Sequence, residues 1–237
     1  AGKKQYVLSL SQRCPLTAQE SKDPEFSKKP FHIPLVFALL NASTGNEIAL
    51  STEHSSDFAI NSENQSLLHL KQETQNFVFN NMEQKPMLSI NRQFSAPIHL
   101  ERTLSTDEQL FLMKHDTDAF NRWEACQNIY LKLWTECLTN TNLQIPEQIC
   151  QAFNSILSDS KLDDGLKAKL IEWPSTSYFA QMQTKLNGPL FLQTRNHLLT
   201  QLSLYCEKNL LGIYKAFHGI NTNSLDPADI NRRALKN

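Results

Sequence analysis

The chain has 237 residues, 40% of them hydrophobic, which is enough apolar material for one large folded domain or two ordinary ones. Its formal net charge is −1 and its lysines and arginines are scattered, so the basic footprint of a nucleic-acid-binding protein is missing. The longest apolar runs, at 33–40 and 198–205, are too short or too interrupted to cross a bilayer, and the N-terminal residues lack the apolar core of a signal peptide. We therefore expect a soluble, cytoplasmic protein that binds neither nucleic acid nor membranes.

The cysteines are Cys14, Cys126, Cys137, Cys150 and Cys206, an odd number, widely spaced and without a C-x-x-C pair. This pattern argues against a disulfide framework and against a structural zinc site. Buried thiols in a reducing compartment are the simpler interpretation. A catalytic cysteine would need an orienting histidine, and nothing in the sequence pairs one with it.

The first half of the chain, from Tyr6 to about Thr103, has a hydrophobic period near two, which puts alternate side chains on opposite faces of a strand. Turn-forming residues at 22–24, 41–46 and 84–86 separate the runs at the spacing of an all-β sandwich. The alternating sets are Tyr6, Leu8 and Leu10 against Val7, Ser9 and Ser11; Phe77 with Phe79; and Leu88 and Ile90 against Ser89 and Asn91.

One predicted strand, Ile33–Leu40, is apolar on both faces. A strand of a two-sheet sandwich needs only one apolar face, so we expect its second face to pack against something other than the opposite sheet. Such packing would suit a domain that lies between neighbours.

The period changes to that of helices after Ser105, where Ser105 and Glu108 form the S-x-x-E pattern of a capping box. We place the domain boundary here. The sequence predicts an α+β protein of two domains, a β-sandwich over 1–104 and a helical domain over 105–237.

The second helix is expected to turn Phe120, Trp123, Tyr130, Trp134 and Cys137 toward a core, since their spacings are three, four and seven. Their helical spacing could be mistaken for a ligand-binding box, but core packing is the better account.

The remaining helices follow with short links, which favours a helical array that grows by stacking pairs, although no clean sequence repeat is present. Shorter helices are expected around 166–172 and 175–184. A third helix is expected to open at Pro146 and bury Ile149, Phe153 and Ile156, and a long one over 189–217 to carry Leu192, Leu199, Leu202, Tyr205, Leu210 and Tyr214.

A last helix is predicted to open with Asp226 as its N-cap, Pro227 in its first position and Asp229 in its first turn. It stops within about three turns, and so short a helix is marginal in isolation. The pattern leads us to expect that the chain is a piece of a longer protein.

Several segments, in a fixed order along nearly the whole chain, carry a resemblance to a known family. They are Tyr6–Pro15, Lys29–Pro34, Phe77–Phe79, Phe94–Pro97, Phe111–Ala125 with the sequence FLMKHDTDAFNRWEA, and Asp229–Asn237. Together they resemble the C-terminal part of the bacterial aminopeptidase N family of zinc aminopeptidases.

This resemblance implies a particular place in a larger enzyme. Members of the family have a β-saddle domain, a thermolysin-like zinc domain, a small β-sandwich and a helical superhelix, in that order. The chain resembles the third domain, an Ig-like sandwich, and the first part of the fourth.

The family's chemistry uses an H-E-x-x-H motif with a downstream glutamate, a tyrosine that stabilises the oxyanion, and a G-A-M-E-N loop that holds the substrate amine. H-E-x-x-H puts two imidazoles on one helix face, where they share a zinc ion. None of the seven histidines here is followed by glutamate, and no two lie four residues apart: they are His32, His54, His69, His99, His115, His197 and His218. We therefore predict no catalytic, cofactor-binding or metal-binding residue in this chain, and zinc only in the parent enzyme.

Four groups of residues have a functional reading beside a structural one. His115, Asp116 and Asp118 suggest a metal or acid–base cluster, but they stand between two helices, where Thr117 or Asp116 is expected to cap the second helix.

Arg122 and Glu124 flank Trp123. We expect them to make interhelical or interdomain hydrogen bonds rather than bind substrate. Arg232 and Arg233 are also assigned structural roles, but whether one of them faces the substrate cavity of the intact enzyme stays open. Met82-Glu83 resembles part of the amine-holding loop, yet Asn81 and Gln84 flank it, so we expect a turn.

The predicted function is that of a non-catalytic part of an enzyme that removes N-terminal amino acids from peptides by zinc-assisted attack of water. The chain would link the missing catalytic domain, its expected partner, to the helical domain that encloses the active site and limits entry to peptides. The alternative is a stand-alone interaction protein, a β-sandwich joined to a helical adaptor. A hydrolase with its own site would need a nucleophile, base and orienter that the sequence does not announce.

Overall fold

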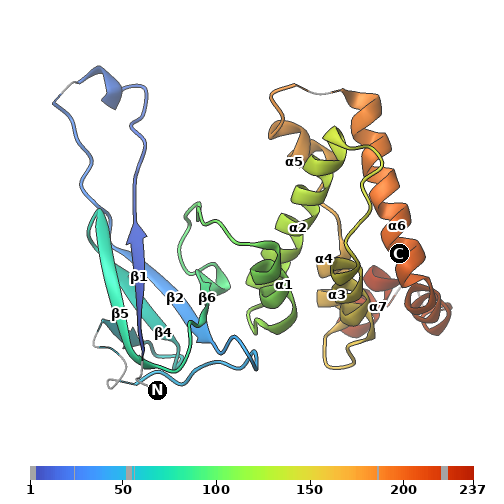
Figure 1. The fold of residues 1–237 in the computed structure, drawn as a ribbon, viewed down its shortest axis with the longest axis horizontal. Coiled ribbons are helices and arrows are strands. Elements are labelled where there is room, and N and C mark those ends of the chain that lie inside the picture. The colour runs from blue at the N-terminus through green and yellow to red at the C-terminus, as the bar shows by residue number, and fades with distance from the viewer. Residues whose placement is uncertain (1–3, 24, 52–54, 56, 186, 220–223) are drawn as a thin grey trace. The chain divides into compact units, whose positions relative to one another are not determined.

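The computed structural model describes residues 4–23, 25–51, 55, 57–185, 187–219 and 224–237. The chain forms two compact units, one built mainly of strands and one of helices (Figure 1). The sandwich unit comprises Ala1–Thr103 together with His115–Asn121, and the helical unit comprises Leu104–Lys114 and Arg122–Asn237. The short segment His115–Asn121 thus packs with the strands, although it lies between helices in the sequence.

The sandwich unit has two antiparallel sheets, with strand orders β1-β5 and β3-β4-β2-β6. Its elements are β1 (Lys4–Ser11), η1 (Glu20–Lys22), β2 (Ile33–Leu40), β3 (Phe58–Ile60), β4 (Ser66–Leu70), β5 (Thr74–Met82), β6 (Met87–Ile90) and η2 (Arg92–Phe94). The predicted β half is therefore confirmed. The turns expected at 41–46 and 84–86 follow β2 and precede β6, and Pro24 of the turn expected at 22–24 lies outside the described residues.

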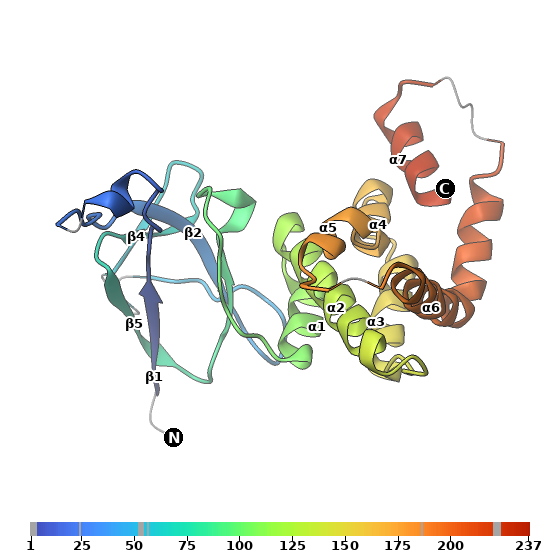
Figure 2. The ribbon, with the colours of Figure 1, turned by 90° about the horizontal axis from the view of Figure 1, so that it is seen from above.

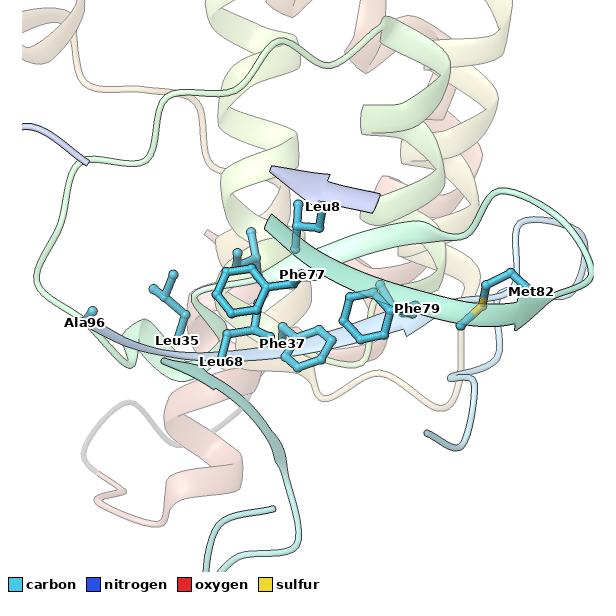
Figure 3. Packing of buried hydrophobic residues seen from close by; sticks show 10 residues of the cluster. Leu8, Leu35, Phe37, Leu68, Phe77, Phe79, Met82 and Ala96 are labelled. Atoms are coloured by element: carbon cyan, nitrogen blue, oxygen red, sulfur yellow. The ribbon is translucent and has the colours of Figure 1, made fainter. Parts of the chain in front are cut away.

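The core of this unit lies between the two sheets (Figure 3). Leu8 on β1 pairs with Phe77 on β5, while Phe37 on β2 pairs with Ile90 on β6, and all four side chains point inward. The alternation read from the sequence predicted the inward residues Leu8, Phe77 and Phe79 correctly, because a period of two fixes which side chains share a face.

Strand β2 is buried on both faces, as its sequence predicted. Leu35, Phe37 and Leu39 face the core. On the opposite face Val36, Ala38 and Leu40 are only 7%, 6% and 0% exposed. This second face is called the outer face below, and η2 packs beside it.

The helical unit contains seven helices among the residues described (Figures 1 and 2). They are α1 (Thr106–His115), α2 (Ala119–Thr139), α3 (Glu147–Ser158), α4 (Asp164–Ile171), α5 (Thr176–Gln181), α6 (Gly188–Ala216) and α7 (Pro227–Lys236). Helix α3 packs against α6 and α4, and α7 packs against α4, which is the neighbour-to-neighbour stacking of a helical array.

Hydrogen bonds from capping side chains confirm two of the predicted helix starts, those of α1 and α7. Before α1, the Ser105 amide donates to Glu108 Oε2 at 2.9 Å and the Glu108 amide to Ser105 Oγ at 3.2 Å, which completes the capping box. Asp226 caps α7 through a 2.8 Å hydrogen bond from the Ala228 amide, and Pro227 occupies the first turn. In α3, which starts directly after Pro146, the residues predicted to be buried are buried: Ile149, Phe153 and Ile156.

An aromatic cluster forms the centre of the helical unit. The Tyr130 ring lies 4.8 Å from Phe153 and 4.5 Å from Trp173, and Trp134 lies 4.4 Å from Phe191. Both polar tips are satisfied: the Tyr130 hydroxyl donates to Leu170 O at 3.2 Å and the Trp134 indole to Phe191 O at 3.1 Å.

Two sequence-based assignments of helix faces were wrong. Trp123 was expected in the core with Tyr130 and Trp134, but it is 36% exposed, because α2 begins outside the aromatic cluster and only its later turns enter it. On α6, Leu192, Tyr205 and Tyr214 are exposed, and the buried stripe is Phe191, Thr194, Leu198 and Cys206. Apolar residues occur all round α6, so periodicity alone did not identify the buried face.

Candidate functional site

The histidines that the structure describes do not gather into a metal site. Among the described residues no group of three or more His, Cys, Asp and Glu side chains is placed to hold a metal ion. His54 lies outside the described residues. His197 contacts Leu143 O at 3.0 Å, and the His218 ring lies 5.6 Å from Tyr214. The residues present therefore do not fit the zinc ion that the sequence resemblance implies for the parent enzyme.

Two of the described imidazoles lie side by side: His32, which directly precedes β2, and His69 on β4. His32 Nε2 and His69 Nδ1 are 2.8 Å apart and share a hydrogen bond. Burial, then the neighbouring His32 and Lys71, lower the pKa of His69 below its ordinary 6.5. The neutral form of His69 is therefore favoured near neutral pH.

The thiols are not set up for nucleophilic catalysis. Cys126, Cys137, Cys150 and Cys206 are buried, and burial raises the pKa of each of them, that of Cys206 to about 11. Thiols with such pKa values stay protonated and unreactive at neutral pH. Cys14 departs from the expectation of buried thiols, because it is exposed and accepts a 3.4 Å hydrogen bond from Lys28 Nζ.

The segment His115–Asn121 makes several polar contacts within the sandwich unit. Asp118 caps α2, since its Oδ1 accepts a 2.9 Å hydrogen bond from the Asn121 amide. Asp116 Oδ1 in turn accepts from the Asp118 amide at 2.9 Å. The prediction that this cluster forms a helix cap is confirmed, but the expected capping residue, Thr117 or Asp116, was wrong because Asp118 is one position closer to the first helical turn.

The same segment is tied to the loops around the outer face. Arg92 Nη1 pairs with Glu47 Oε1 at 2.7 Å, and the Thr117 hydroxyl donates to Glu47. Burial alone would raise the pKa of Glu47, but these hydrogen bonds outweigh it and hold the pKa below its ordinary value. Asp118 Oδ2 also accepts from the Gln93 amide at 2.9 Å.

The backbone under this segment is strained. Asn91, Gln93 and Phe94 have φ values of 57°, 54° and 54°, in the left-handed region that large side chains rarely adopt. Each such residue costs about 1–3 kcal/mol and persists only where the surroundings hold it. Here the bond from Gln93 to Asp118 and the Phe94 ring, 5.4 Å from Phe120, supply that hold.

A cavity of about 410 Å³ opens beside these loops. The guanidinium of Arg92 at its rim is already paired with Glu47. Its lining residues are Val36, Phe37, Ala38, Glu47, Ile48, Ala49, Leu50, Ile60, Asn64, Gln65, Ser66, Arg92 and Gln93. The lining holds no nucleophile and base arranged for catalysis.

The other residues singled out from the sequence take structural positions. Arg122 is buried, and its Nε donates to Met113 O at 2.9 Å, an interhelical hydrogen bond as predicted. Arg233 Nη2 donates to Ser224 O at 2.7 Å, and Arg232 Nη1 lies 3.4 Å from Asp229 Oδ1 one turn earlier on α7. Met82-Glu83 was expected to form a turn, but Met82 still belongs to β5, and only Glu83 lies in the bend that follows.

The sequence analysis did not identify two buried polar residues here, Ser89 on β6 and Asn121 in the segment His115–Asn121. Ser89 alternates with the core residues of β6, and this pattern ordinarily marks an exposed position. In the structure Ser89 is 0% exposed, and its Oγ accepts from Asn121 Nδ2 at 2.9 Å. The apolar outer face of the neighbouring β2 was the one available signal that something covers this side of the sheet.

Across the described parts of the chain, the helices offer no stretch that is both long and apolar enough to span a membrane.

Comparison with known families assigns both halves of the chain. Residues 1–103 match a domain of unknown function with an Ig-like fold, DUF3458. Residues 106–237 match a domain of unknown function made of ARM repeats, DUF3458_C.

The curated relatives are aminopeptidases. Aminopeptidase N of Escherichia coli is 30% identical over 98% of this chain and 26% of its own length. Those of Caulobacter vibrioides and Haemophilus influenzae are 28% and 23% identical over 67% and 98% of this chain, and 18% and 26% of their own lengths. The chain thus spans about a quarter or less of the relatives it matches.

A solved structure shows the same fold. Legionella pneumophila aminopeptidase A in complex with aspartic acid superimposes with a TM-score of 0.75 and 23% identity, over 99% of this chain and 25% of that chain. The Ig-like unit and the helical array occur there together in one protein. The chain belongs to the aminopeptidase N family and corresponds to the region that carries its DUF3458 Ig-like and ARM-repeat domains.

Proposed function

We propose that this chain is a non-catalytic part of a zinc-dependent aminopeptidase that removes N-terminal amino acids from peptides. In this proposal the sandwich domain, 1–104, links the catalytic domain to the helical domain, 105–237. The helical domain forms part of the enclosure around the active site.

The observation that carries the proposal is the match to aminopeptidase N over 98% of the chain, combined with a sequence that lacks H-E-x-x-H. That motif supplies two zinc ligands and the glutamate that activates water. The ligands and the catalytic groups would therefore come from the remainder of the longer protein.

The proposed partners are the catalytic domain of the same protein and, for the intact enzyme, peptide substrates. We also propose a cytoplasmic location. Four of the five cysteines are buried free thiols, which suits a reducing compartment, and the near-neutral charge suits neither nucleic acid nor an anionic membrane surface.

The test is hydrolysis of alanyl- and leucyl-p-nitroanilide by the purified 237-residue chain with added zinc. We expect no release of nitroaniline, while full-length aminopeptidase N of E. coli, as the positive control, releases it. Zinc-dependent release that stays with the chain through further purification and disappears with a chelator would show that the chain has its own metal site, and would end the proposal.

A further inference from the structure

A pocket of buried polar atoms lies where the segment His115–Asn121 covers the outer face of β6. Ser89, Asp116 and Asn121 are 0%, 1% and 1% exposed. Ser89 touches both of the others: its Oγ accepts from Asn121 Nδ2 at 2.9 Å, and its hydroxyl hydrogen-bonds the Asp116 carboxyl. The three side chains thus form one cluster, and this cluster plays no part in the function proposed above.

The hydrogen bonds of the cluster leave two oxygen atoms over. Asp116 Oδ1 accepts from the Asp118 amide at 2.9 Å, but Asp116 Oδ2 has no partner among the described residues. Asn121 Oδ1 also has none. An amide oxygen only accepts, and an ionised carboxylate only accepts, so neither atom can supply a hydrogen to the other.

The surroundings of Asp116 favour its neutral, protonated form. Arg92 and Asp118 act on it electrostatically, and Arg92 is already paired with Glu47. With Asp116 ionised, Asp116 and Glu47 would share the Arg92 guanidinium, and Asp118 would repel Asp116. The neighbouring His115 stands against Gly45. Burial raises the pKa of Asp116 above its ordinary 3.8, and the Asp118 amide, Ser89 and Arg92 do not offset this effect.

We propose that Ser89, Asp116 and Asn121 form a buried proton site, in which Asp116 is a neutral carboxylic acid whose Oδ2–H supplies the donor that the Asn121 amide oxygen lacks. One hydrogen then satisfies both open atoms. It also removes a negative charge that Asp118 repels and that would otherwise share Arg92 with Glu47. Release of the proton at higher pH loosens the hold of the segment on the sheet.

The decisive variant is Asp116→Asn, in which an amide N–H₂ replaces the proposed O–H while the amide oxygen still accepts from the Asp118 amide. A group whose folded-state pKa is raised stabilises the fold at low pH, and this stability is lost as pH rises through the folded value. The wild-type unfolding temperature should therefore fall relative to Asp116→Asn as pH rises from about 5 to about 8. At the upper end the variant is expected to be at least as stable as the wild type.

Asp118→Asn is the matched control, because it removes the same charge two residues away. Both oxygens of Asp118 accept from backbone amides, those of Asn121 and Gln93, so an asparagine there loses an acceptor. This variant should melt below the wild type at every pH tested. The opposite sign of two chemically identical substitutions separates the proton site from a general effect of charge.

A direct readout is the infrared C=O stretch of a protonated carboxylic acid. We expect such a band in the wild-type chain at the lower end of this pH range and its loss in Asp116→Asn. The proposal is overturned if the band is missing, or if Asp116→Asn is destabilised to the same extent as Asp118→Asn. A third outcome also overturns the proposal: wild-type stability that is lost when the sodium or potassium of the buffer is replaced by a bulky organic cation. The site would then hold a metal cation instead of a proton.

Discussion

At the scale of single residues, both the backbone conformation and the packing at Gly45 require a residue without a side chain. Its φ of +78° lies in the left-handed region, and its amide donates to Asn41 O at 2.8 Å to close the turn after β2. A Cβ at Gly45 would lie 2.8 Å from the Cβ of His115 and closer still to the imidazole ring. The turn and the segment His115–Asn121 therefore meet through a glycine.

We predict that Gly45→Ala destabilises the chain more than Gly219→Ala. Both glycines have positive φ, +78° and +85°, but none of the residues that the structure describes lies within 4 Å of a Cβ at Gly219. The left-handed conformation costs an alanine about 1–2 kcal/mol at either site, and overpacking against His115 adds about 1–3 kcal/mol at Gly45 only. Urea unfolding of the two variants measures the difference. Equal losses of free energy would mean that His115 moves aside freely.

Residue-level function was only partly readable from the sequence. The run from His115 to Asp118 announced a helix cap, because aspartate before a helix has a local and well-understood role. The burial of Asp116 did not show, since it depends on Ser89, which is 27 positions away in the sequence. Contacts of that kind arise from the packing of β6 against the segment, and no periodicity encodes them.

At the scale of elements, the Trp134 indole of α2 makes polar contacts with α6 inside an apolar cluster, to Phe191 O and to the Thr194 hydroxyl. Thr194 is buried, and its hydroxyl accepts from the Trp134 indole at 3.2 Å and donates to Leu190 O at 3.0 Å. Thr135 makes the same backward bond, to Leu131 O at 2.7 Å, but is exposed. The two threonines differ mainly in burial and in the indole partner.

We predict that Thr194→Val lowers the free energy of unfolding by about 1 kcal/mol, because the indole loses one acceptor and the buried hydroxyl bond is removed. Thr135→Val, the control, should stay within about 0.5 kcal/mol of the wild type. Thermal or urea unfolding followed by circular dichroism measures both. A loss at Thr135 as large as that at Thr194 would show that the backward helix bond, not the contact with Trp134, carries the effect.

The order and type of the elements could largely be predicted from the sequence, because strand alternation, the capping box at Ser105 and the cap at Asp226 are local signals. The buried face of α6 could not. Thr194, a polar residue, belongs to that face only because Trp134 offers it a partner. Which of several apolar stripes is buried depends on the neighbours, and the neighbours are set by the tertiary fold.

At the scale of the whole molecule, the aromatic residues divide unevenly between the units. All three tryptophans, Trp123, Trp134 and Trp173, belong to the helical unit. Trp134 and Trp173 are 0% and 7% exposed, whereas Trp123 is 36% exposed. The intrinsic fluorescence of the chain therefore reports on the helical unit.

We predict that acrylamide quenches one component of this fluorescence strongly and the rest weakly. Trp123→Phe should remove the strongly quenched component, because the other two indoles lie in the aromatic cluster. Trp173→Phe, as the control, should leave that component in place. Strong quenching that persists in Trp123→Phe would mean that the cluster around Trp134 opens to solvent in the native chain.

The exposed thiol of Cys14 gives the sandwich unit a matching probe. The other four thiols are buried and held protonated, so a maleimide dye should attach at Cys14 under native conditions. The efficiency of energy transfer from the tryptophans to that dye then measures the distance between the two units. The unmodified sequence therefore already contains the fluorescence donors, in the helical unit, and the attachment site for the acceptor dye, in the sandwich unit.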